Sequence, residues 1–158
     1  MVFTLLEQAK TSSHFQSLAT DAMEEQWRGE LVFACSKRVN TILPLQAEAK
    51  AIKWALTLAA NLEFEAIIIE LDSQVCSNLL SDLEAAPPWR MKSICDDSRI
   101  LLASSSKVSV CWVSRLCNMA PHSLAKWSLA CKFFGSFDVG NSPPAFVSVI
   151  QGEACLPV

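Results

Sequence analysis

Two acidic residues follow an apolar run, at a position where their side chains could do chemistry. Residues 67–69 are three isoleucines, and Glu70 and Asp72 come directly after them. Such a run, bounded by polar residues, predicts a central strand buried on both faces. Asp72 then lies at the carboxyl end of that strand, the edge of an α/β sheet where ligands bind. A charged site is one interpretation of this position, and the other is that Asp72 or Ser73 caps the helix that follows.

A further acid, Glu48, falls on the apolar face of the helix predicted over residues 44–62. It follows Leu45 by three residues and precedes Ile52 by four, so it shares the face that these residues turn toward the core. A carboxylate there must be neutral, paired or bound to a metal, because a lone buried charge is costly. Glu48 and Asp72 can meet at one edge of the sheet, and two converging carboxylates without a cation suggest a hard divalent ion.

Strands and helices alternate around these acids. Strands are predicted at residues 30–36, 66–71 and 107–114, and helices at residues 44–62, 73–83, 89–104 and 118–134. This alternation predicts an α/β domain with helices packed on a sheet. We expect the domain over residues 15–134. Residues 1–14 are poorly defined, with a possible first strand, and residues 135–158 are expected to form a flexible tail, since glycine, proline and serine break the periodicity.

The composition is typical of a globular protein from a reducing compartment. Of the 158 residues, 51% are apolar and 18% are charged, and no apolar run has the length of a membrane span. Seven cysteines are scattered without a C-x-x-C pair, which favours buried free thiols over disulfides or a zinc site. The first residues lack the features of a signal peptide, and we expect a nuclear or cytoplasmic protein without a membrane partner.

The net charge of −3 hides an asymmetry along the chain. Residues 1–87 hold twelve acids and six Lys or Arg, which gives −6, and residues 88–158 hold four acids and seven Lys or Arg, which gives +3. A basic half can face phosphates. Its charges are dispersed, however, and an ordinary solvated surface explains them equally well.

Three segments together resemble a known family. AEAKAIKWAL, IIIELDS and RLCNMAPHSLAKW, in this order, resemble the ribonuclease H type 1 domain, in particular the plant reverse-transcriptase-like version found in proteins derived from retroelements. The resemblance covers residues 20–134 and implies the α/β ribonuclease H-like fold, with a mixed central sheet and helices on both faces. It also implies four carboxylates that bind two Mg²⁺ ions. With these ions, domains of the family cleave the RNA strand of an RNA–DNA hybrid.

The resemblance assigns roles to four residues near the site. Glu48 matches the glutamate of the first helix, and Asp72 matches the aspartate that ends the next strand. Asn118 matches the asparagine of the last helix. His122 stands where the family has its final aspartate. A neutral imidazole brings no charge and is a poor ligand for Mg²⁺, so the metal site is expected to be weakened.

The first carboxylate of the family pattern has no clear match. Asp21 imitates it, but only eight residues separate this aspartate from the strand predicted at residues 30–36, too few for an intervening strand. The better register makes residues 17–23 the second strand and leaves the first strand to residues 1–14, which contain no aspartate. Either the hairpin is truncated or the carboxylate is missing.

These residues predict a nucleic-acid-binding domain that cleaves hybrids poorly or not at all. Glu48 and Asp72 are its expected Mg²⁺ ligands, and His122 and Asp21 are further candidates for the catalytic set. The expected partner is an RNA–DNA hybrid or single-stranded nucleic acid. Its contacts are expected from Arg90, Lys92, Arg115, Asn118 and Lys126.

Two other functions fit the sequence less well. The alternative is an interaction or scaffold module that keeps the fold without metal or hybrid, which the modest charge permits. A flavodoxin-like ligand domain ranks last, because a phosphate-binding glycine loop is missing. The glycines are Gly29, Gly135, Gly140 and Gly152.

Overall fold

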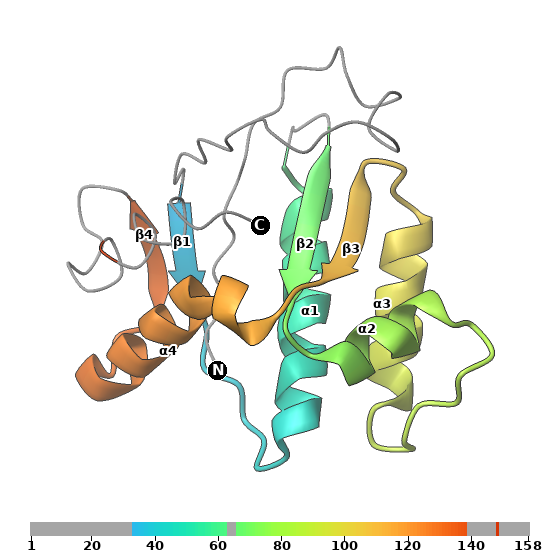
Figure 1. Ribbon diagram of the computed structural model, residues 1–158, viewed down its shortest axis with the longest axis horizontal. Coiled ribbons are helices and arrows are strands. Elements are labelled where there is room, and N and C mark those ends of the chain that lie inside the picture. Colours follow the sequence, from blue (N-terminus) through green and yellow to red (C-terminus); the bar gives the residue numbers. More distant parts are fainter. Residues whose placement is uncertain (1–32, 63–65, 139–147, 149–158) are drawn as a thin grey trace.

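The computed structural model describes residues 33–62, 66–138 and 148 (Figure 1). Its elements, in chain order, are β1 Phe33–Ser36, α1 Pro44–Ala60, β2 Ile67–Leu71, α2 Gln74–Ser81, α3 Lys92–Ala103, β3 Val108–Trp112, the 3₁₀ helix η1 Arg115–Cys117, α4 Met119–Cys131 and β4 Gly135–Asp138. The predicted alternation of strands and helices is confirmed from β1 to α4. The expected first and second strands, and Asp21, lie outside the described residues.

Helix α1 begins at Pro44, as predicted, and ends at Ala60, two residues before the predicted end. Pro44 stands in the first turn, where a missing N–H costs no intrahelical hydrogen bond. Beyond the last turn, the side-chain amide of Asn61 donates to the carbonyl of Thr57 at 2.7 Å. The buried face is rich in alanine, which lets the helix approach β2 closely, and Figure 1 shows α1 behind this strand.

Strands β2 and β3 form a parallel pair, in which Ile67 is opposite Val108 and Leu71 is opposite Trp112. Burial alternates along β2. Ile69 is buried, whereas Ile68 is 42% exposed. The prediction that this strand is buried on both faces is wrong, because the buried cluster of side chains covers one face and Ile68 points to the other. Among the described strands β2 pairs with β3 alone, so its central position stays a prediction.

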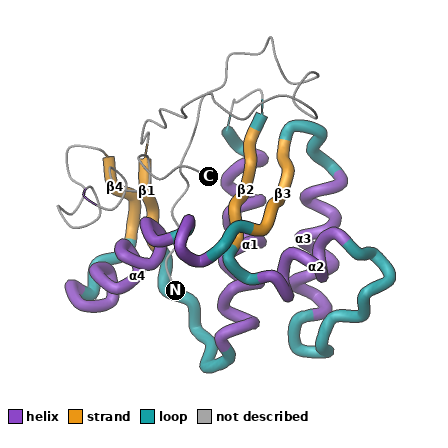
Figure 2. Tube along the Cα trace, in the orientation of Figure 1, coloured by secondary structure: helices purple, strands orange, loops and turns teal. Residues whose placement is uncertain are grey.

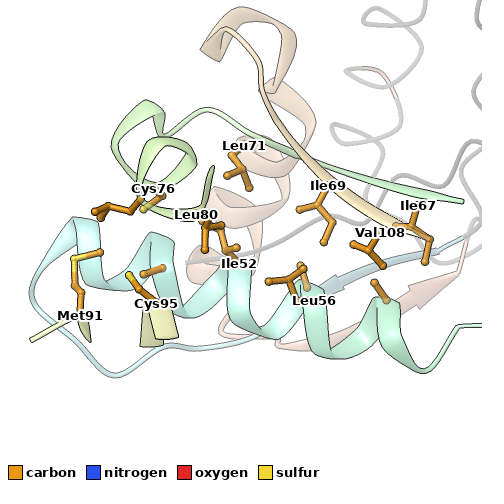
Figure 3. Close-up of a cluster of buried hydrophobic side chains, with 14 residues drawn as sticks. Ile52, Leu56, Ile67, Ile69, Leu71, Cys76, Leu80, Met91, Cys95 and Val108 are labelled. Carbon is orange, nitrogen blue, oxygen red and sulfur yellow. The ribbon is translucent and has the colours of Figure 1, made fainter. Parts of the chain in front are cut away.

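One hydrophobic cluster joins α1, α2, α3 and the β2–β3 pair (Figure 3). Its labelled members are Ile52, Leu56, Ile67, Ile69, Leu71, Cys76, Leu80, Met91, Cys95 and Val108. Each large aliphatic side chain buried in this way contributes about 1.5–3 kcal/mol relative to an exposed one. The cluster therefore fixes the first turn of α1 against the carboxyl end of β2, and these two segments carry the candidate acids.

The second strand pair lies apart from the first, beside α4 (Figure 2). Strands β1 and β4 are antiparallel, with Ser36 opposite Gly135. Lys132 adopts a left-handed conformation (φ 53°) that ends α4, and Gly135 has φ 154°, which favours glycine where the chain enters β4. Strand β4 lies beyond residue 134, where the sequence predicted a tail.

The described cysteines are all free thiols. Three of them, Cys35, Cys76 and Cys95, are buried as expected, whereas Cys117 and Cys131 are exposed. No helix within the described residues is long and apolar enough to cross a membrane.

Candidate nucleic-acid site

Asp72 leaves β2 at the carboxyl edge of the strand pair and does not cap the next helix. The N-cap of α2 is Ser73, whose hydroxyl oxygen accepts from the backbone N–H of Cys76 at 3.4 Å. Asp72 Oδ2 instead lies 3.0 Å from Nε2 of His122. Of the two interpretations of this stretch, the cap therefore belongs to Ser73, and Asp72 is available for a site.

The hydrogen bond between Asp72 and His122 joins the end of β2 to the first turns of α4, fifty residues further along the chain. Ala120 and Leu124, two residues before and after His122, are buried and anchor the first turns of α4. The two side chains are largely shielded from water, with 11% of Asp72 and 26% of His122 exposed. The carboxylate accepts from the ring N–H, and the pair becomes an ion pair when the imidazole is protonated.

Glu48 shares the electrostatic environment of this pair. Burial raises the pKa of Glu48, and the negative charge of Asp72 raises that pKa further, whereas His122 and Arg115 lower it. These four side chains come from α1, the end of β2, α4 and η1. Asp72 and His122 are therefore in contact, and Glu48 and Arg115 lie near enough for their charges to interact. That Glu48, Asp72 and His122 form one functional site stays a prediction.

The donor set does not fit the two Mg²⁺ ions that the resemblance implies. In the part of the chain that the structure describes, no three His, Cys, Asp or Glu side chains are grouped so as to hold a metal ion. His122 occupies one oxygen of Asp72, and its nitrogen is not a ligand that Mg²⁺ prefers.

Three residues predicted to contact nucleic acid lie along η1 and α4. Arg115 and Lys126 are exposed. Asn118 stands at the N-cap position of α4, but its side chain makes no capping hydrogen bond. Its φ of −125° and ψ of 37° depart from the extended geometry that a capping residue adopts.

The other two predicted contacts, Arg90 and Lys92, lie at the beginning of α3. Lys92 pairs with Asp96 at 2.9 Å, and the guanidinium carbon of Arg90 lies 4.9 Å from the ring centroid of Trp89. The sequence predicted Trp89 as the first residue of the helix at residues 89–104, whereas the structure places it in the turn before α3. The two prolines directly before this tryptophan were the signal for a turn there.

Comparison with known proteins agrees with this fold. Residues 25–128, about two thirds of the chain, match the profile of the reverse transcriptase-like family, and the chain belongs to that family. A similar solved structure is RNase H1 from the halophilic archaeon Halobacterium salinarum NRC-1, with a TM-score of 0.58 and 25% identity over 65% of this chain and 78% of that one. No curated protein matches the chain. The fold is the ribonuclease H-like α/β fold that the sequence motifs implied.

Proposed function

We propose that this ribonuclease H-like domain binds nucleic acid, with RNA–DNA hybrid as its main ligand, and cleaves the hybrid weakly or not at all. Family membership and the likeness to an RNase H1 support the class of ligand. The hydrogen bond between His122 and Asp72 supports the proposal that cleavage is weak or absent. By the resemblance, His122 brings a nitrogen to a position where the family has a metal-binding carboxylate.

Hydrolysis with two metals requires enough negative charge to hold both ions against their mutual repulsion. The described residues supply Glu48 and Asp72. Burial, and then the charge of Asp72, raise the pKa of Glu48, so a second negative charge beside Asp72 is disfavoured. His122 adds none, and in its protonated form it cancels one. Such a site is better suited to holding a strand than to cutting it.

Binding is assigned to the basic residues beside this pair. Arg115 is exposed and close enough to the site for its charge to lower the pKa of Glu48, and Lys126 is exposed further along α4. Lys and Arg that neutralise phosphates release counterions, so affinity should fall steeply with salt.

Fluorescence anisotropy with a blunt RNA–DNA hybrid, measured at low and at physiological salt, tests this binding. The double variant Arg115→Ala/Lys126→Ala should bind about tenfold more weakly and show a shallower salt dependence. Lys53→Gln is the matched control for lost positive charge, because Lys53 pairs with Asp97 between α1 and α3. Equal affinity of the double variant and the wild type would contradict the proposal.

A scaffold function on the same fold is the second candidate. The net charge of −3 and the 75% exposed Leu116, next to Arg115, favour it. Absence of hybrid binding at low salt would leave this candidate in place.

A further inference from the structure

The most exposed large apolar side chains in the described part of the chain are Ile42 and Trp89, which are 96% and 79% exposed. They belong to different loops, one before α1 and the other before α3. Tryptophan is highly buried on average, and scattered exposed apolar residues need no explanation by themselves. Here, however, the two loops are tied together.

Gln46, in the first turn of α1, links the two loops. Its Oε1 accepts from the hydroxyl of Thr41 at 2.6 Å, and its Nε2 donates to the carbonyl of Arg90 at 3.1 Å. The hydroxyl oxygen of Thr41 accepts in turn from the backbone N–H of Leu43 at 3.1 Å. Both ends of the Gln46 amide are satisfied, so the loops are held in one arrangement.

The turn that carries Trp89 is also anchored in the core. Met91 is buried in the hydrophobic cluster (Figure 3), and its backbone N–H donates to the carbonyl of Pro88 at 2.8 Å. Pro87 and Pro88 restrict the backbone just before the tryptophan. Trp89 is therefore held outward by a rigid turn, and an aromatic ring held in advance loses little entropy when it binds a partner.

One cation lies against this ring, and a second supports the neighbouring loop. Arg90 lies over Trp89, at 4.9 Å from the ring centroid. Lys50 donates to the carbonyl of Asn40 at 3.2 Å, in the loop that carries Ile42. Residues 85–92 contain two cations and no acid. An exposed aromatic ring with cations beside it is the combination that binds unpaired nucleotides, because every base has a face that stacks and every phosphate attracts a cation.

We propose that the Gln46-bridged surface, made of Ile42, Gln46, Trp89 and Arg90, binds single-stranded nucleic acid. A base stacks on Trp89, Arg90 contacts the adjacent phosphate, and Ile42 packs against the next nucleotide. The inference rests on the proposed function and adds a second class of ligand to it. Gln46 and Glu48 both lie near the N-terminal end of α1, two residues apart and therefore on different faces of the helix, so the surface is separate from the Asp72–His122 pair.

Binding of fluorescein-labelled oligo(dT), followed by anisotropy at low salt, tests the proposal. Replacement of one stacking aromatic side chain by alanine costs about five- to one-hundred-fold in affinity, and we expect about tenfold for Trp89→Ala. Trp89→Phe should retain most of the affinity, since it keeps a stacking ring. Leu83→Ala is the matched control, because Leu83 is 72% exposed and belongs to the same α2–α3 connection; it should bind as the wild type does.

Blunt hybrid, with no unpaired base, separates this inference from the proposed function. Trp89→Ala should bind blunt hybrid as the wild type does, whereas Arg115→Ala/Lys126→Ala should bind it more weakly. Normal oligo(dT) binding by Trp89→Ala overturns the inference and leaves the hybrid site intact. Equal weakening of oligo(dT) and hybrid binding also overturns it, because Trp89 would then not be specific for unpaired bases. If the wild type binds neither ligand at low salt, the proposed function fails and the surface is a protein contact instead.

Discussion

His122 of α4 holds Asp72 at the carboxyl end of β2, with 3.0 Å between Nε2 and Oδ2. By the resemblance, both residues align with carboxylates of the ribonuclease H pattern. We therefore expect this hydrogen bond to replace a shared metal site, which would make position 122 sensitive to a restored carboxylate.

His122→Asp should make the stability of the domain depend on Mg²⁺. Without Mg²⁺, the new carboxylate repels Asp72 and Glu48 and removes a hydrogen bond, so the free energy of unfolding should fall by about 1–3 kcal/mol. Added Mg²⁺ should recover part of this loss, because an oxygen anion replaces a neutral nitrogen. Thermal unfolding with and without Mg²⁺ measures both effects. His122→Asn, which stays neutral, is the control and should not respond to Mg²⁺.

Glu48→Gln should stabilise the domain at neutral pH. Burial, and then the charge of Asp72, raise the pKa of Glu48 in the folded state above its unfolded value. The folded state therefore holds this proton more tightly, and stability is lost as pH rises from the unfolded pKa through the folded one. Glutamine does not ionise, so the variant does not lose this stability as the pH rises. Urea unfolding from pH 4 to pH 7 should show a smaller decrease for Glu48→Gln than for the wild type, whereas the exposed Glu84→Gln should follow the wild type.

Arg99 should be a major contributor to stability. Its guanidinium donates to the carbonyls of Leu79, Asp82 and Ala85 at 2.7–3.0 Å, and so holds the end of α2 and the loop after it against α3. Arg99→Ala should cost about 2–4 kcal/mol, since it leaves these carbonyls without their donor. Arg99→Lys should recover only part of this, because an ammonium group lacks the planar fork. A loss under about 0.5 kcal/mol in urea unfolding would show that water replaces the arginine.

The cysteines should differ sharply in reactivity. Burial raises the pKa of Cys35 to about 11, so little thiolate forms at pH 8, whereas Cys117 and Cys131 are exposed. Native labelling with iodoacetamide, read by peptide mass spectrometry, should modify Cys117 and Cys131 well before Cys35. Denaturant should remove the difference. Rapid labelling of Cys35 in the native protein would show that β1 opens easily.

Regular patterns in the sequence predicted the framework of this domain. Ile52 and Leu56 recur at helical spacing in α1, and the isoleucine run of β2 stands out against its polar flanks. Strand β4 escaped prediction because it has only four residues, including glycine and serine, and forms through its pairing with β1. The exposure of Ile68 could not be predicted either, since an apolar run does not say which of its faces a helix will cover.

The candidate site was predictable in part. Glu48 stood out as a charge on an apolar helix face, and Asp72 as an acid at the end of a strand. The choice between Asp72 and Ser73 as helix cap was open, because either side chain can accept the same N–H. The bridge from Gln46 to Arg90 spans 44 residues and leaves no local pattern, so only the folded chain reveals it.

The proposal that the domain binds RNA–DNA hybrid without cutting it can be tested by one measurement. The wild-type domain is incubated with hybrid and Mg²⁺, and the RNA products are separated. We expect the wild-type domain to bind the hybrid in a salt-sensitive way and to cleave its RNA strand no more than the Asp72→Asn variant does. Mg²⁺-dependent cleavage of the RNA strand by the wild type, abolished in Asp72→Asn, would contradict it. That result would mean that an acid such as Asp21 completes the site beside Glu48 and Asp72.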